Sequence, residues 1–156
     1  MTHEFKKVAL VGLYTDERVA EPMRAIAGYL TKAGAEVLAQ PDLAAPLGAT
    51  PVDAAEIAAR ADLIVAVGGD GTMLHAASLV PGTETPLLGI NRGRLGFLTD
   101  VSPSEMVDSF DQIFAGDYTR ESRMRLRASL HSADGAERSA LALNDVVLQR
   151  LSLIHI

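Results

Sequence analysis

Residues 65–77, VAVGGDGTMLHAA, place three glycines around one aspartate directly after an aliphatic run. The run predicts a buried strand. Residues 73–80, MLHAASLV, are apolar on nearly every side, which predicts a helix packed into the interior. Glycines let a ligand approach the backbone, and a helix N-terminus offers free N–H groups to an anion. Because ligands in open α/β sheets bind beyond the carboxyl ends of strands, this stretch predicts a ligand site in an α/β fold.

Strand-like and helix-like segments alternate along the first three quarters of the chain. Short aliphatic runs predict strands at 6–14, 35–40, 62–67 and 85–91. Apolar residues at helical spacing predict further helices at 16–34, 53–61 and 102–117. The last of these helices begins with a capping-box pair, Ser102 and Glu105, and with Pro103 at its first position. The alternation predicts a Rossmann-like, mainly parallel sheet with helices on both faces.

Two segments of the chain lack this alternation. Residues 41–52 hold three of the seven prolines and predict a loop. From about residue 119, polar and apolar residues alternate around the turn SADGAE, which predicts an antiparallel hairpin. We therefore expect an α/β domain at 1–120, which carries the glycine turn, and the start of a β-rich second domain at 121–150.

The last six residues, LSLIHI, form a short apolar end without a cap, a charge or a turn. A lone hairpin has too few strands to be stable by itself. We therefore expect the chain to be a fragment of a longer protein, with residues 151–156 as a non-native tail. The alternative is that the six residues form a genuine terminal strand.

Composition and charge argue against several classes of protein. The formal net charge is −6, which is unlike most nucleic-acid-binding proteins. There is no cysteine for a disulfide or a thiolate metal site. The four histidines lack metal-ligand spacing, so no metal-ligating residue is assigned. No signal-peptide pattern and no membrane-spanning apolar run occur. We therefore expect a cytoplasmic protein that binds neither nucleic acid nor membrane.

The glycine turn does not match the common phosphate-binding patterns. A Walker loop needs a glycine-lysine pair, and the chain contains none. Gly69 and Gly71 fit the start of a dinucleotide fingerprint, but Leu74 occupies its third glycine position and Asp70 would face the pyrophosphate. A carboxylate at this place can instead accept a proton from a sugar hydroxyl, orient that hydroxyl or hold a magnesium ion.

Three motifs together resemble the NAD kinase family. GGDGT, residues 68–72, resembles a signature that NAD kinases share with lipid kinases of the diacylglycerol and sphingosine type and, more distantly, with phosphofructokinases. GINRGRLGFLTD, residues 89–100, resembles the NAD kinase pattern G-x-N-x-G-x-L-G-F-L. ALNDVVL, residues 142–148, resembles the asparagine-acid pair of that family. The resemblance extends from about Lys7 to Arg150.

The resemblance implies transfer of a phosphoryl group from ATP to the 2′-hydroxyl of the adenosine ribose of NAD, with magnesium. It implies that Asp70 is the catalytic carboxylate and that the backbone of Gly71 contacts the nucleotide. Asn144 and Asp145 would hold a ribose, because an amide and a carboxylate match the hydroxyls of a vicinal diol. The α/β domain would be nucleotide-binding, and the full-length parent would be a homo-oligomer.

The other motif residues are expected to have packing, phosphate-contacting or loop-shaping roles. Phe97 would pack near the adenine or serve as a core residue, and His75 would lie near phosphate or serve a structural role. Arg92 and Arg94 are expected to be solvated. The other motif residues are expected to shape the loops; they are Gly68, Gly69, Thr72, Asn91, Gly93 and Gly96.

Two alternatives to the NAD kinase interpretation remain open. One is a lipid kinase of the same superfamily, and the other is a non-catalytic nucleotide-binding module. The family's C-terminal domain supplies further nucleotide contacts and is almost absent here, so we expect this chain alone to have little or no activity.

Overall fold

The computed structural model describes residues 4–92, 98–99 and 101–147. The chain divides into two compact units, and the boundary lies between Arg120 and Glu121.

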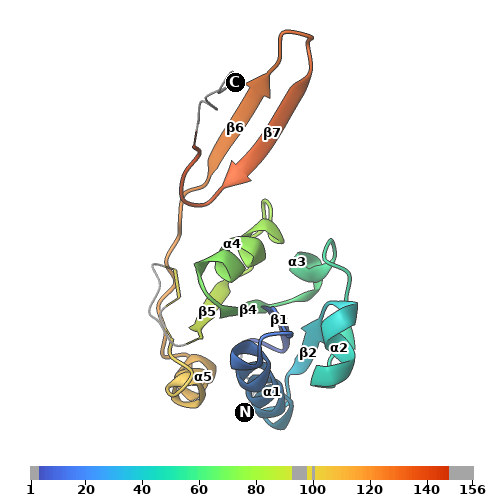
Figure 1. Cartoon of the computed structure of the whole chain (residues 1–156). Coiled ribbons are helices and arrows are strands. Elements are labelled where there is room, and N and C mark those ends of the chain that lie inside the picture. The colour runs from blue at the N-terminus through green and yellow to red at the C-terminus, as the bar shows by residue number, and fades with distance from the viewer. Residues whose placement is uncertain (1–3, 93–97, 100, 148–156) are drawn as a thin grey trace, which may run out of the picture. The chain divides into compact units, whose positions relative to one another are not determined.

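The first unit is built on a five-stranded parallel sheet, as the alternation of segments predicted (Figure 1). The four longer strands are mostly aliphatic, as is usual for strands that are buried on both faces of a sheet. Gly12 lies opposite Val67, and Gly68 lies opposite Asn91, so these strands end along one edge. The strand order is β3-β2-β1-β4-β5, which means that the chain reverses direction across the sheet between β1 and β4. The strands are β1 Lys7–Gly12, β2 Glu36–Ala39, β3 Thr50–Pro51, β4 Leu63–Gly68 and β5 Leu87–Asn91.

Helices cover both faces of this sheet, which confirms that prediction (Figure 1). Helices α1 (Glu17–Lys32), α2 (Pro41–Leu47) and α5 (Met106–Ala115) contribute to a core on the face that carries Val8 and Leu10. Helices α3 (Ile57–Arg60) and α4 (Asp70–Ser78) contribute to a core on the opposite face. Among the described residues, no helix is long and apolar enough to cross a membrane.

Residues 41–52 are not a loop, so that prediction was wrong. Pro41 occupies the first turn of α2, where its missing N–H costs nothing. The short helix buries Leu43, Ala44 and Leu47 in the core, and Gly48 ends it with a φ of 62°. Burial of three apolar side chains therefore outweighs the high proline content of this segment.

The predicted capping box at the start of α5 was also wrong. The helix begins at Met106, and residues 103–105 form a turn instead of its first turn of helix. The hydroxyl of Ser102 donates to Glu105 Oε2 at 2.6 Å, and the residue before the helix is Glu105, which makes no side-chain capping hydrogen bond. Within the helix, Phe110 is fully buried.

The helix predicted at 73–80 is present as α4, but it is not packed into the interior. It begins earlier, at Asp70, and its buried residues are Ala76 and Ala77. The Leu74 side chain is 38% exposed, and His75 is exposed as well. Two small alanines face the sheet. The many apolar residues of this segment therefore predicted more burial than the helix has.

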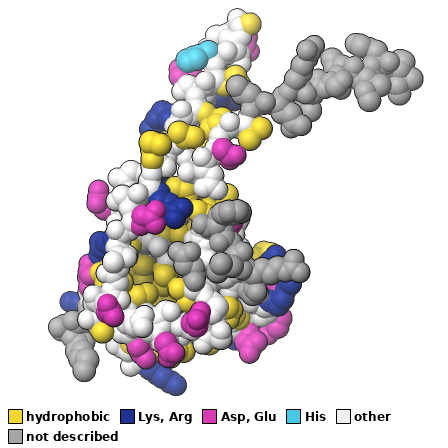
Figure 2. All heavy atoms as spheres, turned by 90° about the vertical axis from the view of Figure 1, so that its left-hand side faces the viewer, with side chains coloured by type: hydrophobic (Ala, Val, Ile, Leu, Met, Phe, Trp, Pro, Cys, Tyr) yellow, Lys and Arg dark blue, Asp and Glu magenta, His cyan; other side chains and the backbone are white. Residues whose placement is uncertain are grey.

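The second unit contains the predicted antiparallel hairpin. Strand β6 (Leu126–His131) pairs with β7 (Glu137–Ala142), with His131 opposite Glu137 at the turn. Gly135 supports the turn with a φ of 83°. Hydrophobic side chains lie on the surface of this unit (Figure 2); Leu126, Leu130 and Leu141 are exposed.

Candidate functional site

A pocket lies at the carboxyl edge of the sheet, where the strand order reverses between β1 and β4. Its volume is about 300 Å³. Its walls come from the end of β1, from the residue after β2 and from the first two turns of α4. Such a reversal point is the usual ligand position in open α/β sheets. The pocket is lined by Val11, Gly12, Leu13, Gln40, Gly71, Thr72 and His75.

Gly68 and Thr72 explain how the chain turns from β4 into α4. A Cβ atom on Gly68 would lie 2.2 Å from Thr72 Oγ1 and 2.9 Å from Thr72 Cβ. Only a residue without a side chain therefore leaves room for Thr72. The backbone N–H of Thr72 donates to the Gly69 carbonyl at 3.0 Å, so the helix begins directly after the glycine pair.

Gly71 has a different environment from Gly68. Among the described residues, a Cβ atom on Gly71 would meet no heavy atom within 4 Å apart from the backbone of its own helix. The residue is exposed and forms part of the pocket wall. Internal packing therefore does not require glycine here, whereas a ligand in close contact with the backbone would require it.

Asp70 is the first residue of α4 and is partly buried. Its Oδ1 accepts the backbone N–H of Leu98 at 3.0 Å. The contact joins the GGDGT turn to the segment 89–100 and holds the carboxylate in one orientation. A carboxylate in the first turn also interacts favourably with the helix dipole.

Thr99 and Val101 lie against β5, and Arg92 lies beside the glycine turn. The N–H of buried Asn91 donates to the Val101 carbonyl at 2.8 Å, and the N–H of Arg92 donates to the Gly68 carbonyl at 3.2 Å. A Cβ atom on Gly89 would lie 2.9 Å from Thr99 Cγ2. Gly89 therefore permits the close approach that brings the two motifs together.

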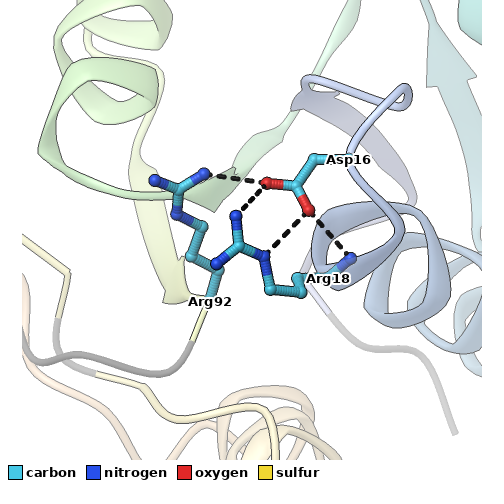
Figure 3. A network of polar contacts seen from close by, with 3 residues as sticks. All are labelled: Asp16, Arg18 and Arg92. Atoms are coloured by element: carbon cyan, nitrogen blue, oxygen red, sulfur yellow. Dashed lines mark hydrogen bonds and ion pairs between the residues drawn. The ribbon is translucent and has the colours of Figure 1, made fainter.

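A charged network lies at the same edge of the sheet (Figure 3). Asp16 Oδ2 accepts from Arg92 Nη1 at 2.9 Å and from Arg18 Nη2 at 2.9 Å. Asp16 Oδ1 accepts from Arg18 Nε at 3.0 Å and from the Arg18 backbone N–H at 3.1 Å. The side-chain hydrogen bond from Arg18 lowers the pKa of Asp16, so this carboxylate is anionic at neutral pH. Arg92 is exposed, as expected of a solvated arginine, and it also pairs with Asp16.

Most of the expected site residues belong to the first unit, and two belong to the second unit. Asp70, Gly71 and His75 all lie on α4, the first two in its first turn and His75 in its last turn, and Asn91 lies at the end of β5, the strand beside β4. Asn144 and Asp145 are exposed residues of the second unit that follow β7. Four other expected residues lie outside the described residues, as does the expected non-native tail at 151–156; the four are Phe97, Gly93, Gly96 and Arg94.

Sequence reasoning missed Gln40, Leu13 and Asp16. Gln40 directly follows β2, while Leu13 and Asp16 follow β1. The same rule that singled out the glycine turn would have found them, because all carboxyl ends of a parallel sheet meet at one edge. The predicted strands at 6–14 and 35–40 contained Leu13 and Gln40, whereas the observed strands end before these residues.

The described residues contain no group of three or more His, Asp or Glu side chains that could hold a metal ion. Asp70 offers one carboxylate, and it directly precedes Gly71, a residue that lines the pocket. Mg²⁺ commonly takes one or two protein carboxylates together with phosphate oxygens of a substrate. The site therefore fits a magnesium ion that arrives with a phosphate ligand, with Asp70 as its protein ligand.

Comparisons with known proteins match this chain to NAD kinases. A family profile described as ATP-NAD kinase N-terminal domain matches residues 14–118. The chain is 44% identical over 153 residues to an NAD kinase of Paraburkholderia phytofirmans, covering 96% of this chain and 51% of that protein. It is 44% identical over 151 residues to an NAD kinase of Burkholderia thailandensis, covering 95% and 50%. The chain thus spans about half the length of these curated relatives.

Two solved structures are also similar. The crystal structure of yeast NADH kinase complexed with NADH matches with a TM-score of 0.81 at 24% identity, covering 92% of this chain and 48% of that one. An NAD kinase from Archaeoglobus fulgidus in complex with ATP matches with a TM-score of 0.57 at 26% identity, covering 83% and 44%. The first of these likenesses shows that the fold is shared.

Proposed function

Since this chain belongs to the NAD kinase family, we propose that it is the catalytic half of an enzyme that transfers the terminal phosphoryl group of ATP to NAD. The acceptor would be the 2′-hydroxyl of the adenosine ribose, and the product would be NADP. One observation carries the proposal. Asp70 lies at the N-terminus of α4, beside the pocket at the strand reversal, and the backbone of Leu98 orients its carboxylate.

Asp70 would accept the proton of the 2′-hydroxyl as that oxygen attacks the phosphoryl group. The hydrogen bond from Leu98 keeps the carboxylate from rotating away, so it is oriented before the substrate binds. The open backbone at Gly71 and the N-terminus of α4 would receive the phosphates of ATP. His75, on the same pocket wall, would lie near these phosphates.

A magnesium ion bound by Asp70 and the phosphates would neutralise charge on the transferring group. Asn144 and Asp145 would hold a ribose through its hydroxyls, and Phe97 would pack near the adenine. Residues 121–150 would be the start of a β-rich second domain. We also propose that the full-length protein is a homo-oligomer of the cytoplasm that supplies NADP and binds neither nucleic acid nor membrane.

The protein that carries this chain together with a second domain, as in the relatives, is expected to form NADP from NAD, ATP and Mg²⁺. The 156-residue chain alone is expected to form little or none, because Asn144 and Asp145 would lack the sheet that positions them. A coupled assay specific for NADP measures the rate of each of the two proteins. Phosphorylation of diacylglycerol but not of NAD would favour a lipid kinase. ATP binding without any turnover would favour a non-catalytic module, and robust turnover by the chain alone would contradict the second expectation.

Replacing Gly71 with alanine is expected to separate stability from binding. A Cβ atom there meets no other side chain among the described residues, so stability should be unchanged or rise by up to about 1 kcal/mol. The same methyl group would obstruct a nucleotide on the backbone, so the affinity for ATP should fall. Calorimetry and thermal unfolding measure the two effects.

Gly28→Ala provides the matched control. Gly28 lies inside α1, and a Cβ atom there also meets no protein atom within 4 Å. It should change stability in the same direction and leave ATP affinity unchanged. Equal ATP affinity in Gly71→Ala and the unmodified chain would show that no ligand contacts this part of the backbone.

A further inference from the structure

The ion pair between Asp16 and Arg92, here called the Asp16–Arg92 bridge, crosses the carboxyl end of β4. Asp16 lies in the connection after β1, and Arg92 directly follows β5. In the sheet, β1 and β5 are the two neighbours of β4, the strand that ends in Gly68. The Arg92 N–H donates to the Gly68 carbonyl at 3.2 Å, so the backbone of Arg92 is fixed to the first residue of the GGDGT turn.

The two arginines of this network have different roles. Arg18 binds both carboxylate oxygens of Asp16 with its side chain, and Asp16 caps α1 through the Arg18 backbone N–H. Asp16 and Arg18 therefore form a pair with balanced charges at the start of α1. Arg92 adds a further positive charge to this pair, and its side chain is 46% exposed. Figure 3 shows the Arg92 guanidinium reaching this pair from the end of β5.

Arg92 retains donors for a ligand. A guanidinium has five N–H donors, and within the described part of the chain the side chain of Arg92 contacts Asp16 through Nη1. The remaining donors can bind phosphate oxygens in a forked geometry, which is the arrangement that arginine favours. The positive charge would also offset the repulsion between Asp70 and an incoming phosphate.

We infer that Arg92 contacts the phosphate chain of the donor nucleotide and that Asp16 positions it. The inference rests on the proposed function, because it assigns a further residue to the donor side of the same site. Arg92 would be a binding residue, whereas Asp16 would act only through Arg92. The ligand chemistry is a polyphosphate, which both ATP and inorganic tripolyphosphate present.

Calorimetric titration of the chain with inorganic tripolyphosphate and with ATP tests this inference. Arg92→Gln is expected to weaken both affinities about tenfold, because a charge-assisted hydrogen bond is lost. Arg92→Lys should restore part of the affinity, since it keeps the charge without the fork. Asp16→Asn should weaken binding about threefold in the unmodified chain. If Asp16 acts only through Arg92, adding Asp16→Asn to Arg92→Gln should cause no further loss of affinity.

Arg24→Gln is the matched control. Arg24 is another arginine of the first unit, and it pairs with Glu17 on α1 and stacks over Tyr14. Its loss changes the net charge equally and should leave tripolyphosphate affinity unchanged. Circular dichroism verifies that each variant is folded.

Three results would overturn the inference. They are unchanged tripolyphosphate affinity in Arg92→Gln, equal losses in Arg92→Gln and Arg24→Gln, and no tripolyphosphate binding by the unmodified chain. The NADP assay is a separate measurement. If NADP is formed but tripolyphosphate binding does not depend on Arg92, only this inference is wrong. If tripolyphosphate binding depends on Arg92 but no NADP is formed, the proposed acceptor, NAD, is wrong and Arg92 is still a polyphosphate contact.

Discussion

Asp70→Asn is expected to lower the rate of NADP formation about a thousandfold in the full-length protein, because general acid–base catalysis contributes about 10² to 10⁴ to a rate. An amide cannot accept the proton of the 2′-hydroxyl. The asparagine side-chain oxygen can still accept the Leu98 N–H, which is now 3.0 Å from Asp70 Oδ1. The local fold should therefore persist, and NAD affinity should change little. Steady-state kinetics and calorimetry measure the two quantities.

Asp62→Asn is the matched control for this experiment. Asp62 also accepts backbone N–H groups, from Lys6 at 2.9 Å and from Lys7 at 2.8 Å. It lies at the amino ends of β1 and β4, which is the opposite edge of the sheet from the pocket. Its replacement should leave the rate unchanged. If Asp70→Asn retained more than a tenth of the rate, Asp70 would not be the proton acceptor.

Phe110→Ala is expected to lower the free energy of unfolding by about 3–5 kcal/mol, the usual range for removing a large buried aromatic side chain. Phe110 is 0% exposed, and its ring lies 5.7 Å from that of Tyr29 and 6.1 Å from that of Phe114. The substitution leaves a cavity between α5 and α1. Such a loss is a large share of the total stability of a small domain, about 5–15 kcal/mol. Urea unfolding measures it.

Val107→Ala tests whether the loss is specific to the core. Val107 lies on the same helix, and its side chain is 46% exposed. Its truncation should change the free energy of unfolding by less than about 0.5 kcal/mol, as for most surface substitutions. A Phe110→Ala cost below about 1 kcal/mol would show that α5 contributes little to the core.

The fold was largely predictable because its signals are local. Strand-like runs, such as the one that ends at Gly68, alternate with helical segments along the chain. This alternation is typical of an α/β sheet with helices on both faces. The errors arose where packing outweighed local preference. Pro41 and Pro46 suggested a loop, yet burial of Leu43 and Leu47 stabilises a helix there. Leu74 suggested an interior helix, yet α4 turns two alanines toward the sheet.

The candidate site was predictable to a smaller extent. GGDGT gave a strand end, a turn and a helix start from contiguous residues, and the structure has all three. Gln40, which lines the pocket, carries no local signal apart from its place after a strand. Asp16 could be recognised as a helix cap, but its contact with Arg92 could not be foreseen, since 76 residues separate the two.

By itself, the sequence determined that this chain forms an α/β sheet with a carboxylate in a glycine turn, and the resemblance of its motifs pointed to the NAD kinase family. These properties depend on the spacing of neighbouring residues, which is readable without coordinates. Only the tertiary structure decided that β1 and β5 flank β4, that Leu98 orients Asp70, and that Arg92 meets Asp16 across the turn. Strand order and burial are set by long-range packing of the whole unit, which no local pattern specifies.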